Sequence, residues 1–202
     1  MIKNYIFDFG NVLARFYPEE LTRAVVKNEE NLKLIAEVVF DRLYWDRLDD
    51  GSITDDEVKA GIKARLPENL REDAIKAYEG WIDNLVPING MRELVADIKN
   101  EGAKLYLLSN ISIGFAENYH KTDWIRELFS LFDGLVFSGP VGIVKPQPEI
   151  FEHLLNKYSL KREECIFIDD SEKNIKGAEK LGIKTYLFDG DAKKLKKNVN
   201  NA

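Results

Sequence analysis

Short apolar runs alternate with amphipathic segments along most of the chain, and this alternation predicts its strands and helices. Five runs have the length and the flanking turn residues of buried strands, at 5–7, 104–108, 134–137, 165–168 and 184–188. Helical spacing of apolar residues is found over 91–100, 115–129, 148–158 and 172–181. Strands that alternate with helices predict an α/β protein with a doubly wound parallel sheet, covered by helices on both faces.

The segment between the first two strands has a different pattern. From residue 15 to about residue 84 the spacing stays helical, without a strand between the helices. We expect four helices, starting at Pro18, spanning 31–47, following a capping box at 54–57, and spanning 70–84. They predict an α-helical cap domain at 15–87, inserted into a Rossmann-like core of 1–14 and 88–202 and placed over the end of the first strand.

The bulk composition limits the classes of partner. The chain has 202 residues and a formal net charge of −6, with acidic and basic residues interspersed. That charge argues against a nucleic acid or an anionic membrane as the main partner, and no apolar segment approaches the length of a membrane span. The single Cys165 and the charged, strand-like start of the chain lead us to expect a reducing, cytoplasmic setting.

Polar residues follow the predicted strands at the point where each strand ends. They are Asp8 and Gly10 after the first strand, Ser109 and Asn110 after the second, Lys145 after the third, and Asp169 and Asp170 after the fourth. Ligands of open α/β sheets bind outside the carboxyl ends of the strands. We therefore expect these residues to meet over one edge of the sheet.

The chemistry of these residues points to phosphoryl transfer. Three carboxylates that crowd together repel one another unless a cation joins them, and oxygen ligands suit Mg²⁺. A cation, a lysine and a Ser-Asn pair can neutralise a phosphoryl group while Asp8 attacks it in line. Water then hydrolyses the aspartyl phosphate. The pattern predicts hydrolysis of phosphate monoesters, with small-molecule phosphate esters as substrates.

Four motifs in this order resemble those of the haloacid dehalogenase superfamily of phosphohydrolases. They are Phe7-Asp8-Phe9-Gly10-Asn11-Val12, Leu107-Leu108-Ser109-Asn110, Lys145-Pro146-Gln147-Pro148, and Phe167-Ile168-Asp169-Asp170-Ser171 with Asn174. Each motif alone is weak, whereas all four in this order are specific. The resemblance covers nearly the whole chain, including the helical insertion after the first motif.

The resemblance implies a role for each matching residue. It implies that Asp8 is the nucleophile and that Asp8, the Gly10 carbonyl and Asp170 are the Mg²⁺ ligands. It implies that Ser109 and Asn110 are phosphate ligands and that Lys145 balances the charge of Asp8 and the phosphoryl group. Asp169 is implied to hold a metal-bound water or the Lys145 ammonium. The resemblance thus implies a complete nucleophile, metal site and phosphate site.

Position 10 departs from the pattern of most phosphatases in this superfamily, which carry there a second Asp that acts as general acid and base. Gly10 stands in its place, and loss of such a group lowers a rate by about a hundredfold or more. One interpretation is a phosphatase that resembles the bacterial α-glucose-1-phosphatases, whose leaving group is more acidic. The second step then needs a substitute base, either a cap residue or a substrate hydroxyl, and Asp46 and His120 are candidates.

Two other interpretations stay open. The fold also catalyses carbon–halogen cleavage in 2-haloacid dehalogenases, which lack that Asp because halide needs no proton. A third interpretation is a phosphate-ligand sensor without turnover. The Asp169–Asp170 pair favours the Mg²⁺-dependent branch. We therefore expect a Mg²⁺-dependent phosphatase of small phosphate monoesters, with sugar phosphates first among the candidates, and the sequence leaves its oligomeric state open.

Overall fold

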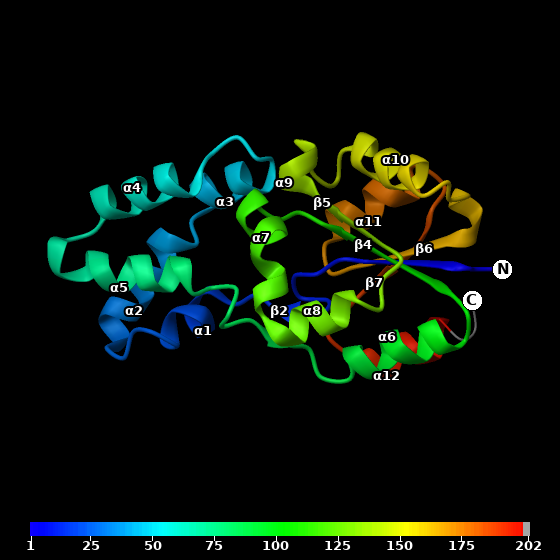
Figure 1. The fold of residues 1–202 in the computed structure, drawn as a ribbon, viewed down its shortest axis with the longest axis horizontal. Coiled ribbons are helices and arrows are strands. Elements are labelled where there is room, and N and C mark those ends of the chain that lie inside the picture. The colour runs from blue at the N-terminus through cyan, green and yellow to red at the C-terminus, as the bar shows by residue number, and fades with distance from the viewer. Residues whose placement is uncertain (200–202) are drawn as a thin grey trace.

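The computed structural model describes residues 1–199 and shows two parts that lie side by side (Figure 1). One part is a parallel sheet flanked by helices, and it contains the amino terminus. The other part is a helical lobe made of α1 to α5. The lobe lies beyond the ends of the strands, at the opposite end of the molecule from the amino terminus.

The sheet has five parallel strands in the order β5-β4-β1-β6-β7. The strands are β1 (Asn4–Phe7), β4 (Lys104–Ser109), β5 (Gly134–Phe137), β6 (Cys165–Asp169) and β7 (Lys184–Leu187). This confirms the doubly wound, Rossmann-like α/β sheet that the sequence predicts. The chain winds outward from β1 in both directions, so β1 lies at the switch point where ligands of such sheets bind.

Helices cover both faces of the sheet, because alternate strand residues point to opposite faces. Ile6 packs with α10 (Pro148–Lys157) and α11 (Glu172–Glu179). Phe7 faces the other way, toward α6 (Met91–Asn100), α8 (Asp123–Phe129) and α12 (Ala192–Val199). The apolar cluster on that second face continues into the helical lobe, so one core joins the two parts.

The helical lobe contains five helices, one more than the pattern predicts. They are α1 (Pro18–Arg23), α2 (Glu29–Val39), α3 (Arg42–Asp49), α4 (Asp55–Arg65) and α5 (Glu68–Glu79). The capping box is confirmed, since Thr54 and Glu57 bond reciprocally at the start of α4. The single helix expected over 31–47 is wrong. Asp41 ends it, because its carboxylate accepts the Leu43 N–H and starts α3 as a new helix.

A second expected helix, over 115–129, is also divided. The structure has α7 (Ile113–Asn118), a 3₁₀ turn at Tyr119–Lys121, and α8. Thr122 takes an extended conformation between the turn and α8, which breaks the helical run. A short α9 (Ser138–Val141) follows β5 where the sequence predicts no helix. Among the residues described, no helix is long and apolar enough to cross a membrane.

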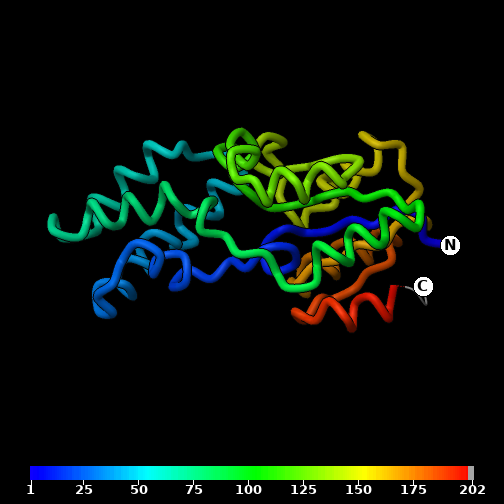
Figure 2. Tube along the Cα trace, turned by 60° about the horizontal axis from the view of Figure 1, so that its bottom comes forward, coloured from blue at the N-terminus to red at the C-terminus, as the bar shows by residue number. Residues whose placement is uncertain are grey.

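Two short strands carry the chain between the sheet and the lobe. β2 (Ala14–Arg15) on the way out pairs antiparallel with β3 (Val86–Pro87) on the way back. Figure 2 shows these two connections running side by side. An aromatic cluster lies beyond them, in which the ring centroids of Phe16 and Trp45 are 4.9 Å apart and those of Trp45 and Trp81 are 5.1 Å apart. The lobe is therefore fixed to the sheet by paired backbone and by packed aromatic rings.

Candidate active site

The carboxyl ends of neighbouring strands bring the polar motif residues together. β1 and β6 pair in register, with Phe7 opposite Ile168. Asp8 and Asp169 follow at the next position of the two strands, and Ser109 ends β4 on the other side of β1. All three polar residues are buried. The sheet itself thus aligns three of the predicted site residues.

Lys145 joins two of these carboxylates. Its Nζ lies 2.8 Å from Asp8 Oδ1 and 2.7 Å from Asp169 Oδ2, and only 1% of its side chain is exposed. Burial disfavours the ammonium, but Asp8 and Asp169 outweigh that effect and raise the pKa of Lys145 above its ordinary value. Lys145 is therefore a fixed positive charge at the end of β1.

Asp169 is held by further hydrogen bonds on both of its oxygens. Asn174 on α11 donates to Oδ1 at 3.0 Å and to Oδ2 at 3.1 Å, and the Ser171 N–H donates to Oδ1 at 2.8 Å. With the Lys145 ammonium these bonds occupy both oxygens of a fully buried carboxylate. Asp169 is thus suited to orient Lys145.

The turn after β1 leaves open space beside Asp8. The Asp8 N–H donates to the Ile168 carbonyl, and the Phe9 N–H donates to Asp8 Oδ1 at 2.7 Å. Asn11 has a φ of 53°, a left-handed conformation that Asn tolerates better than most residues. A Cβ atom added at Gly10 would meet no other atom within 4 Å. A side chain at position 10 would therefore fit, so the absence of the usual Asp is not a matter of space.

Asn110 holds the loop that carries Lys145. Its Nδ2 donates to the Lys145 carbonyl at 3.0 Å, and its Oδ1 accepts the Lys145 N–H at 2.7 Å. The predicted phosphate ligand Asn110 therefore uses its carboxamide to fix main chain. Its side chain positions Lys145, a role that the sequence does not predict.

Three carboxylates of the site lie close enough to share one cation. Ligand oxygens of Asp8, Asp169 and Asp170 all lie within 4.8 Å of one another. Ligands of a single octahedral Mg²⁺ are up to about 4.2 Å apart, which a small side-chain rotation reaches from this spacing. The cluster contains oxygen ligands and no sulfur or imidazole, which fits Mg²⁺ and not zinc. The residues present therefore fit the ion that the motifs imply.

Two carboxylates of this cluster, Asp8 and Asp170, are destabilised as anions when no metal ion is bound. Burial raises the pKa of Asp8 to about 7, with further raising by Asp169 and Asp170 and opposition from Lys145. Partial burial and the neighbouring Asp169 also raise the pKa of Asp170, although Asp170 is the one member exposed to solvent. A divalent ion would relieve both effects, because it favours the charged form of each carboxylate.

A cavity of about 460 Å³ lies over this cluster, between the sheet and the helical lobe. Its floor includes Gly10, Ser109, Lys145 and Asp170, and its lining includes five aromatic side chains. The aromatic residues are Phe9, Phe16, Phe40, Trp45 and Trp81. The indole N–H of Trp45 is already bonded to the Val39 carbonyl at 2.9 Å, so Trp45 presents carbon atoms to the cavity.

One acidic residue of this cavity was missed from the sequence. Asp49, the last residue of α3, lines the cavity together with Lys145. Burial raises the pKa of Asp49 to about 7. The sequence offered Asp46 and His120 as candidates for a substitute base. Neither is among the described residues that line the cavity. Asp46 is exposed and pairs with Arg42 across one turn of α3.

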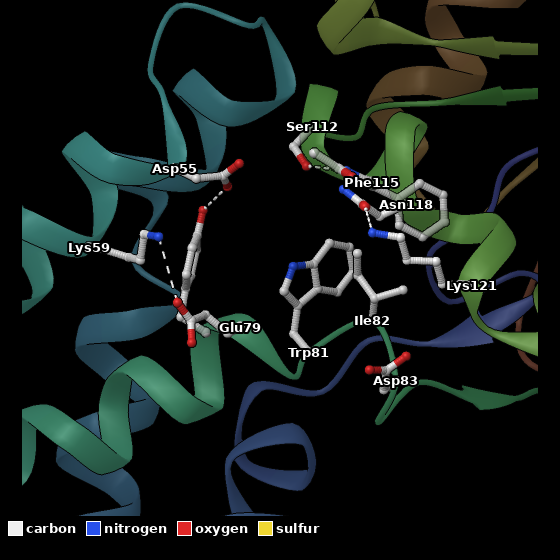
Figure 3. Close-up of a pocket in the computed structure, with 12 residues that line it drawn as sticks. Asp55, Lys59, Glu79, Trp81, Ile82, Asp83, Ser112, Phe115, Asn118 and Lys121 are labelled. Carbon is white, nitrogen blue, oxygen red and sulfur yellow. Dashed lines mark hydrogen bonds and ion pairs between the residues drawn. The ribbon is translucent and has the colours of Figure 1, made fainter.

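A second hollow, of about 310 Å³, lies on the other side of Trp81 (Figure 3). Its lining comes from α4, α5 and α7, with Trp81 and Ile82 in its middle. In the part of the chain that the structure describes, this lining includes none of the four motifs. Trp81 borders both hollows and separates the second from the acidic cluster.

The fold and the site together define a class of protein: a Rossmann-like enzyme with an acidic, oxygen-rich centre at the switch point of its sheet. The model of the haloacid dehalogenase-like hydrolase family matches residues 2–182, and the chain belongs to this family. It is therefore a hydrolase of this family. This confirms the resemblance that the four motifs indicate.

Two relatives of similar length are phosphatases. Sesquiterpene phosphatase astK of Aspergillus oryzae is 27% identical over 183 residues, covering 90% of this chain and 87% of that protein. D-ribitol-5-phosphate phosphatase of Bacteroides thetaiotaomicron is 27% identical over 195 residues, covering 92% and 91%. A HAD family enzyme of Bacteroides thetaiotaomicron, crystallised with magnesium and inorganic phosphate, has a TM-score of 0.69 at 28% identity, covering 92% of this chain and 93% of that chain.

Proposed function

We propose that this protein is a Mg²⁺-dependent phosphatase that hydrolyses small phosphate monoesters, among them sugar phosphates, through an aspartyl phosphate on Asp8. The observation that carries the proposal is the position of Lys145, buried between Asp8 and Asp169, with Asp170 in reach of the same cation. The phosphatase relatives and the magnesium and phosphate bound by a similar enzyme support it.

Each residue of the site has a part in this proposal. Asp8 attacks phosphorus, and Lys145 balances the charge of Asp8 and of the phosphoryl oxygens. Ser109 binds a phosphate oxygen through its hydroxyl, and Asn110 does so through its main-chain N–H, because its carboxamide is occupied by Lys145. Asp169 keeps Lys145 in place.

Asp8, the Gly10 carbonyl and Asp170 would hold the Mg²⁺ ion, which supplies positive charge to the reacting phosphoryl group when bound. The described carboxylate spacing supports Asp8 and Asp170 in that role. Asp169 is less suited to it, because the side chains of Lys145 and Asn174 already bond its oxygens.

The division of the chain follows the same proposal. Residues 1–14 and 88–202 form the catalytic core, and residues 15–87 form a cap that encloses the substrate. The antiparallel pair of β2 and β3 at both boundaries supports this division, as does the cavity between the two parts. We also propose a cytoplasmic location, because the only cysteine is buried and free and the fold needs no oxidising compartment.

Phosphate release from a panel of esters tests the function. The panel contains glucose 1-phosphate, hexose 6-phosphates and an aryl phosphate, each with Mg²⁺ and with a chelator. We expect turnover that needs Mg²⁺ and that disappears in Asp8→Asn. Asp97→Asn is a matched control, since Asp97 is an exposed carboxylate paired with Lys196. Chloride release from 2-chloropropionate without metal would instead indicate a dehalogenase. Absence of product in every assay would indicate a phosphate sensor without turnover.

The isotope content of the products separates two routes of hydrolysis. In water enriched in ¹⁸O, attack on the phosphorus of an aspartyl phosphate places one labelled oxygen in the released phosphate. Attack on the carboxyl carbon, as for an ester intermediate, places the label in the peptide that contains Asp8. We expect label in the phosphate and an unlabelled Asp8 peptide, measured by mass spectrometry after a single turnover.

A further inference from the structure

The proposed reaction contains two proton transfers, and the turn after β1 supplies no group for either. The leaving oxygen has to gain a proton in the first step, and the attacking water has to lose one in the second. Gly10 carries no side chain, and the space beside it is open. The acid and base must therefore reach the phosphoryl group from another wall of the cavity.

Asp49 is the carboxylate that faces the cavity from the opposite side. In the described part of the chain two carboxylates line the cavity, Asp170 and Asp49. Asp170 belongs to the cluster of possible cation ligands, whereas Asp49 does not. Asp49 comes from α3 in the helical lobe, which lies beyond the ends of the strands (Figure 1). It therefore approaches a bound phosphoryl group from the side where the ester oxygen leaves.

The main chain of Asp49 is fixed to the catalytic part of the molecule. The Ser138 hydroxyl, which is fully buried, donates to the Asp49 carbonyl at 2.6 Å. Ser138 Oγ in turn accepts a hydrogen bond of 2.8 Å from the N–H of Ile111, which lies two residues after Ser109. Asp49 is thus bonded, through one hydroxyl, to the loop that follows the second motif.

A glycine contact fixes the same region more closely. Gly51 has a φ of 73°, and a Cβ atom there would lie 2.4 Å from the Gly139 carbonyl oxygen. The end of α3 therefore lies against α9 with no space for a side chain. This close approach sets the depth to which Asp49 enters the cavity.

We infer that Asp49 is the general acid and general base of this enzyme, supplied by the helical lobe in place of the Asp that is missing at position 10. The inference rests on the proposed phosphatase function.

The two steps balance with one proton on Asp49. In the first step Asp8 forms a bond to phosphorus, the bond from phosphorus to the ester oxygen breaks, and that oxygen takes the proton of the Asp49 carboxyl to leave as an alcohol. In the second step water bonds to phosphorus and gives a proton to the Asp49 carboxylate, and the bond from phosphorus to Asp8 breaks. Inorganic phosphate leaves, and Asp8 and protonated Asp49 are restored.

The surroundings of Asp49 suit a group that must hold and release a proton near neutral pH. Burial raises its pKa to about 7, which is near the optimum for a group that acts in both directions. The charged groups around it are Arg42 and Lys145, which lower the pKa, Asp46 and Asp50, which raise it, and Asp170 and Lys173 on the far wall of the cavity. Both protonation states are therefore populated in the absence of substrate.

Comparison of substrates with poor and good leaving groups tests the inference on the full chain with saturating Mg²⁺. We expect Asp49→Asn to lower kcat for a hexose 6-phosphate by about 10²- to 10⁴-fold. With 2,4-dinitrophenyl phosphate the first step needs no acid, so the variant should release one burst of dinitrophenolate per enzyme at the unsubstituted rate and then turn over slowly. The pH profile of the unsubstituted enzyme should change near about pH 7, where Asp49 titrates, and this change should be absent from the variant.

Two further variants provide the control and the rescue. Asp56→Asn alters an exposed carboxylate of the same lobe, outside the cavity, and should leave both substrates unaffected. Gly10→Asp places a carboxyl in the open space beside Asp8. In the Asp49→Asn background it should raise the rate of hexose 6-phosphate hydrolysis at least tenfold above that of Asp49→Asn alone.

The fold is expected to tolerate Asp49→Asn, because the contact with Ser138 uses the main chain. Asp49→Glu serves as a second variant that keeps an acid, and it should retain more hexose phosphatase activity than Asp49→Asn. An Asp49→Asn enzyme with normal kcat on hexose 6-phosphate overturns the inference. So does an equal loss of the burst and of hexose turnover, which indicates a positioning role. An unsubstituted enzyme that hydrolyses no phosphate ester overturns the proposed function itself, and the inference with it.

Discussion

The carboxamide of Asn110 makes two hydrogen bonds to the main chain of Lys145: Nδ2 donates to the Lys145 carbonyl, and Oδ1 accepts the Lys145 N–H. The two residues are 35 positions apart, so this pair closes the loop between β4 and the third motif. Held in this way, Lys145 places its ammonium 2.8 Å from Asp8 Oδ1. The second motif therefore supports the third, apart from any contact with substrate.

Removal of this carboxamide should weaken both the fold and the reaction. Asn110→Ala breaks two hydrogen bonds, each worth about 1 kcal/mol, and leaves partly buried main-chain groups unpaired. We expect the free energy of unfolding to fall by about 2 kcal/mol and kcat/KM to fall by about 10- to 100-fold, because displacement of a catalytic group by about 1 Å has that effect. Denaturant titration and initial rates measure the two quantities.

Asn84→Ala is the matched control, since the Asn84 side chain bonds one carbonyl, that of Gly80, away from the cavity. It should lose about half as much stability and none of the activity. A normal kcat/KM in Asn110→Ala would show that the Lys145 loop holds itself.

Asp8→Asn should abolish turnover and yet stabilise the metal-free protein at alkaline pH. Burial raises the pKa of Asp8 to about 7, so the folded state favours the protonated carboxyl. The stability that this preference contributes is complete below the unfolded pKa, near about 4, and is lost as the pH rises through about 7. The amide has no such loss. We expect the Tm difference in favour of Asp8→Asn to be larger at about pH 8 than at about pH 5.

Mg²⁺ should reverse that order of stability. A ligand that binds only the folded state raises its stability in proportion to the logarithm of ligand concentration over Kd. Thermal melts with increasing Mg²⁺ are expected to raise the Tm of the unsubstituted protein and to leave that of Asp8→Asn nearly constant. An equal rise in both proteins would place the ion away from Asp8.

Lys145→Met should be strongly destabilising, because it leaves two buried carboxylates without their cation. Loss of one partner from a buried ion pair lowers the free energy of unfolding by about 3–5 kcal/mol. The loss should be largest at about pH 8 and should decrease in mild acid, where Asp8 takes up a proton. Chemical denaturation at several pH values measures it.

Lys176→Met gives the comparison for an exposed pair. Lys176 bonds Glu172 across one turn of α11, and both side chains are about two-thirds exposed to solvent. Such pairs contribute about 0.5 kcal/mol. If Lys145→Met lowered the free energy of unfolding by no more than this, Lys145 would not be the group that stabilises the buried carboxylates of Asp8 and Asp169.

The positions of the proposed catalytic groups were predictable because a parallel sheet leaves few choices. Asp8 and Asp169 follow apolar strands, and strands in register bring their carboxyl ends to one edge. A few neighbouring residues were enough to recognise each strand, and the parallel arrangement of the strands then places the residues that follow them at one edge of the sheet. The role of the Asn110 carboxamide was not predictable, since a side-chain amide after a strand can bond either substrate or main chain.

Asp49 was missed for a physical reason that lies several residues away. The apolar spacing over 31–47 predicts one helix, and the carboxylate of Asp41 interrupts it by capping a new one. That break changes the direction of the chain, so α3 points its last residue into the cavity while Asp46 remains in solvent. Contacts between the lobe and the sheet, such as Ser138 with the Asp49 carbonyl, cannot be seen in local patterns.

The depth of α3 should be adjustable through Gly51. Gly51→Ala places a Cβ atom 2.4 Å from the Gly139 carbonyl oxygen, and neither backbone segment can yield without moving α3 away from α9. Gly102 also has a left-handed φ, of 90°, but a Cβ atom there meets nothing within 4 Å. Both substitutions therefore carry the conformational cost of about 1–2 kcal/mol for a left-handed alanine, and only Gly51→Ala adds the clash.

We expect the two variants to separate stability from activity. Gly102→Ala should lower the Tm and keep normal kcat on a hexose 6-phosphate. Gly51→Ala should lower the Tm further and should lower kcat for the hexose ester by at least tenfold, because Asp49 is drawn back from the leaving oxygen. The burst with 2,4-dinitrophenyl phosphate should persist, since Asp8 and Lys145 lie on the other side of the cavity and keep their contact. Equal kcat values in the two variants would mean that the contact between α3 and α9 does not set the position of Asp49.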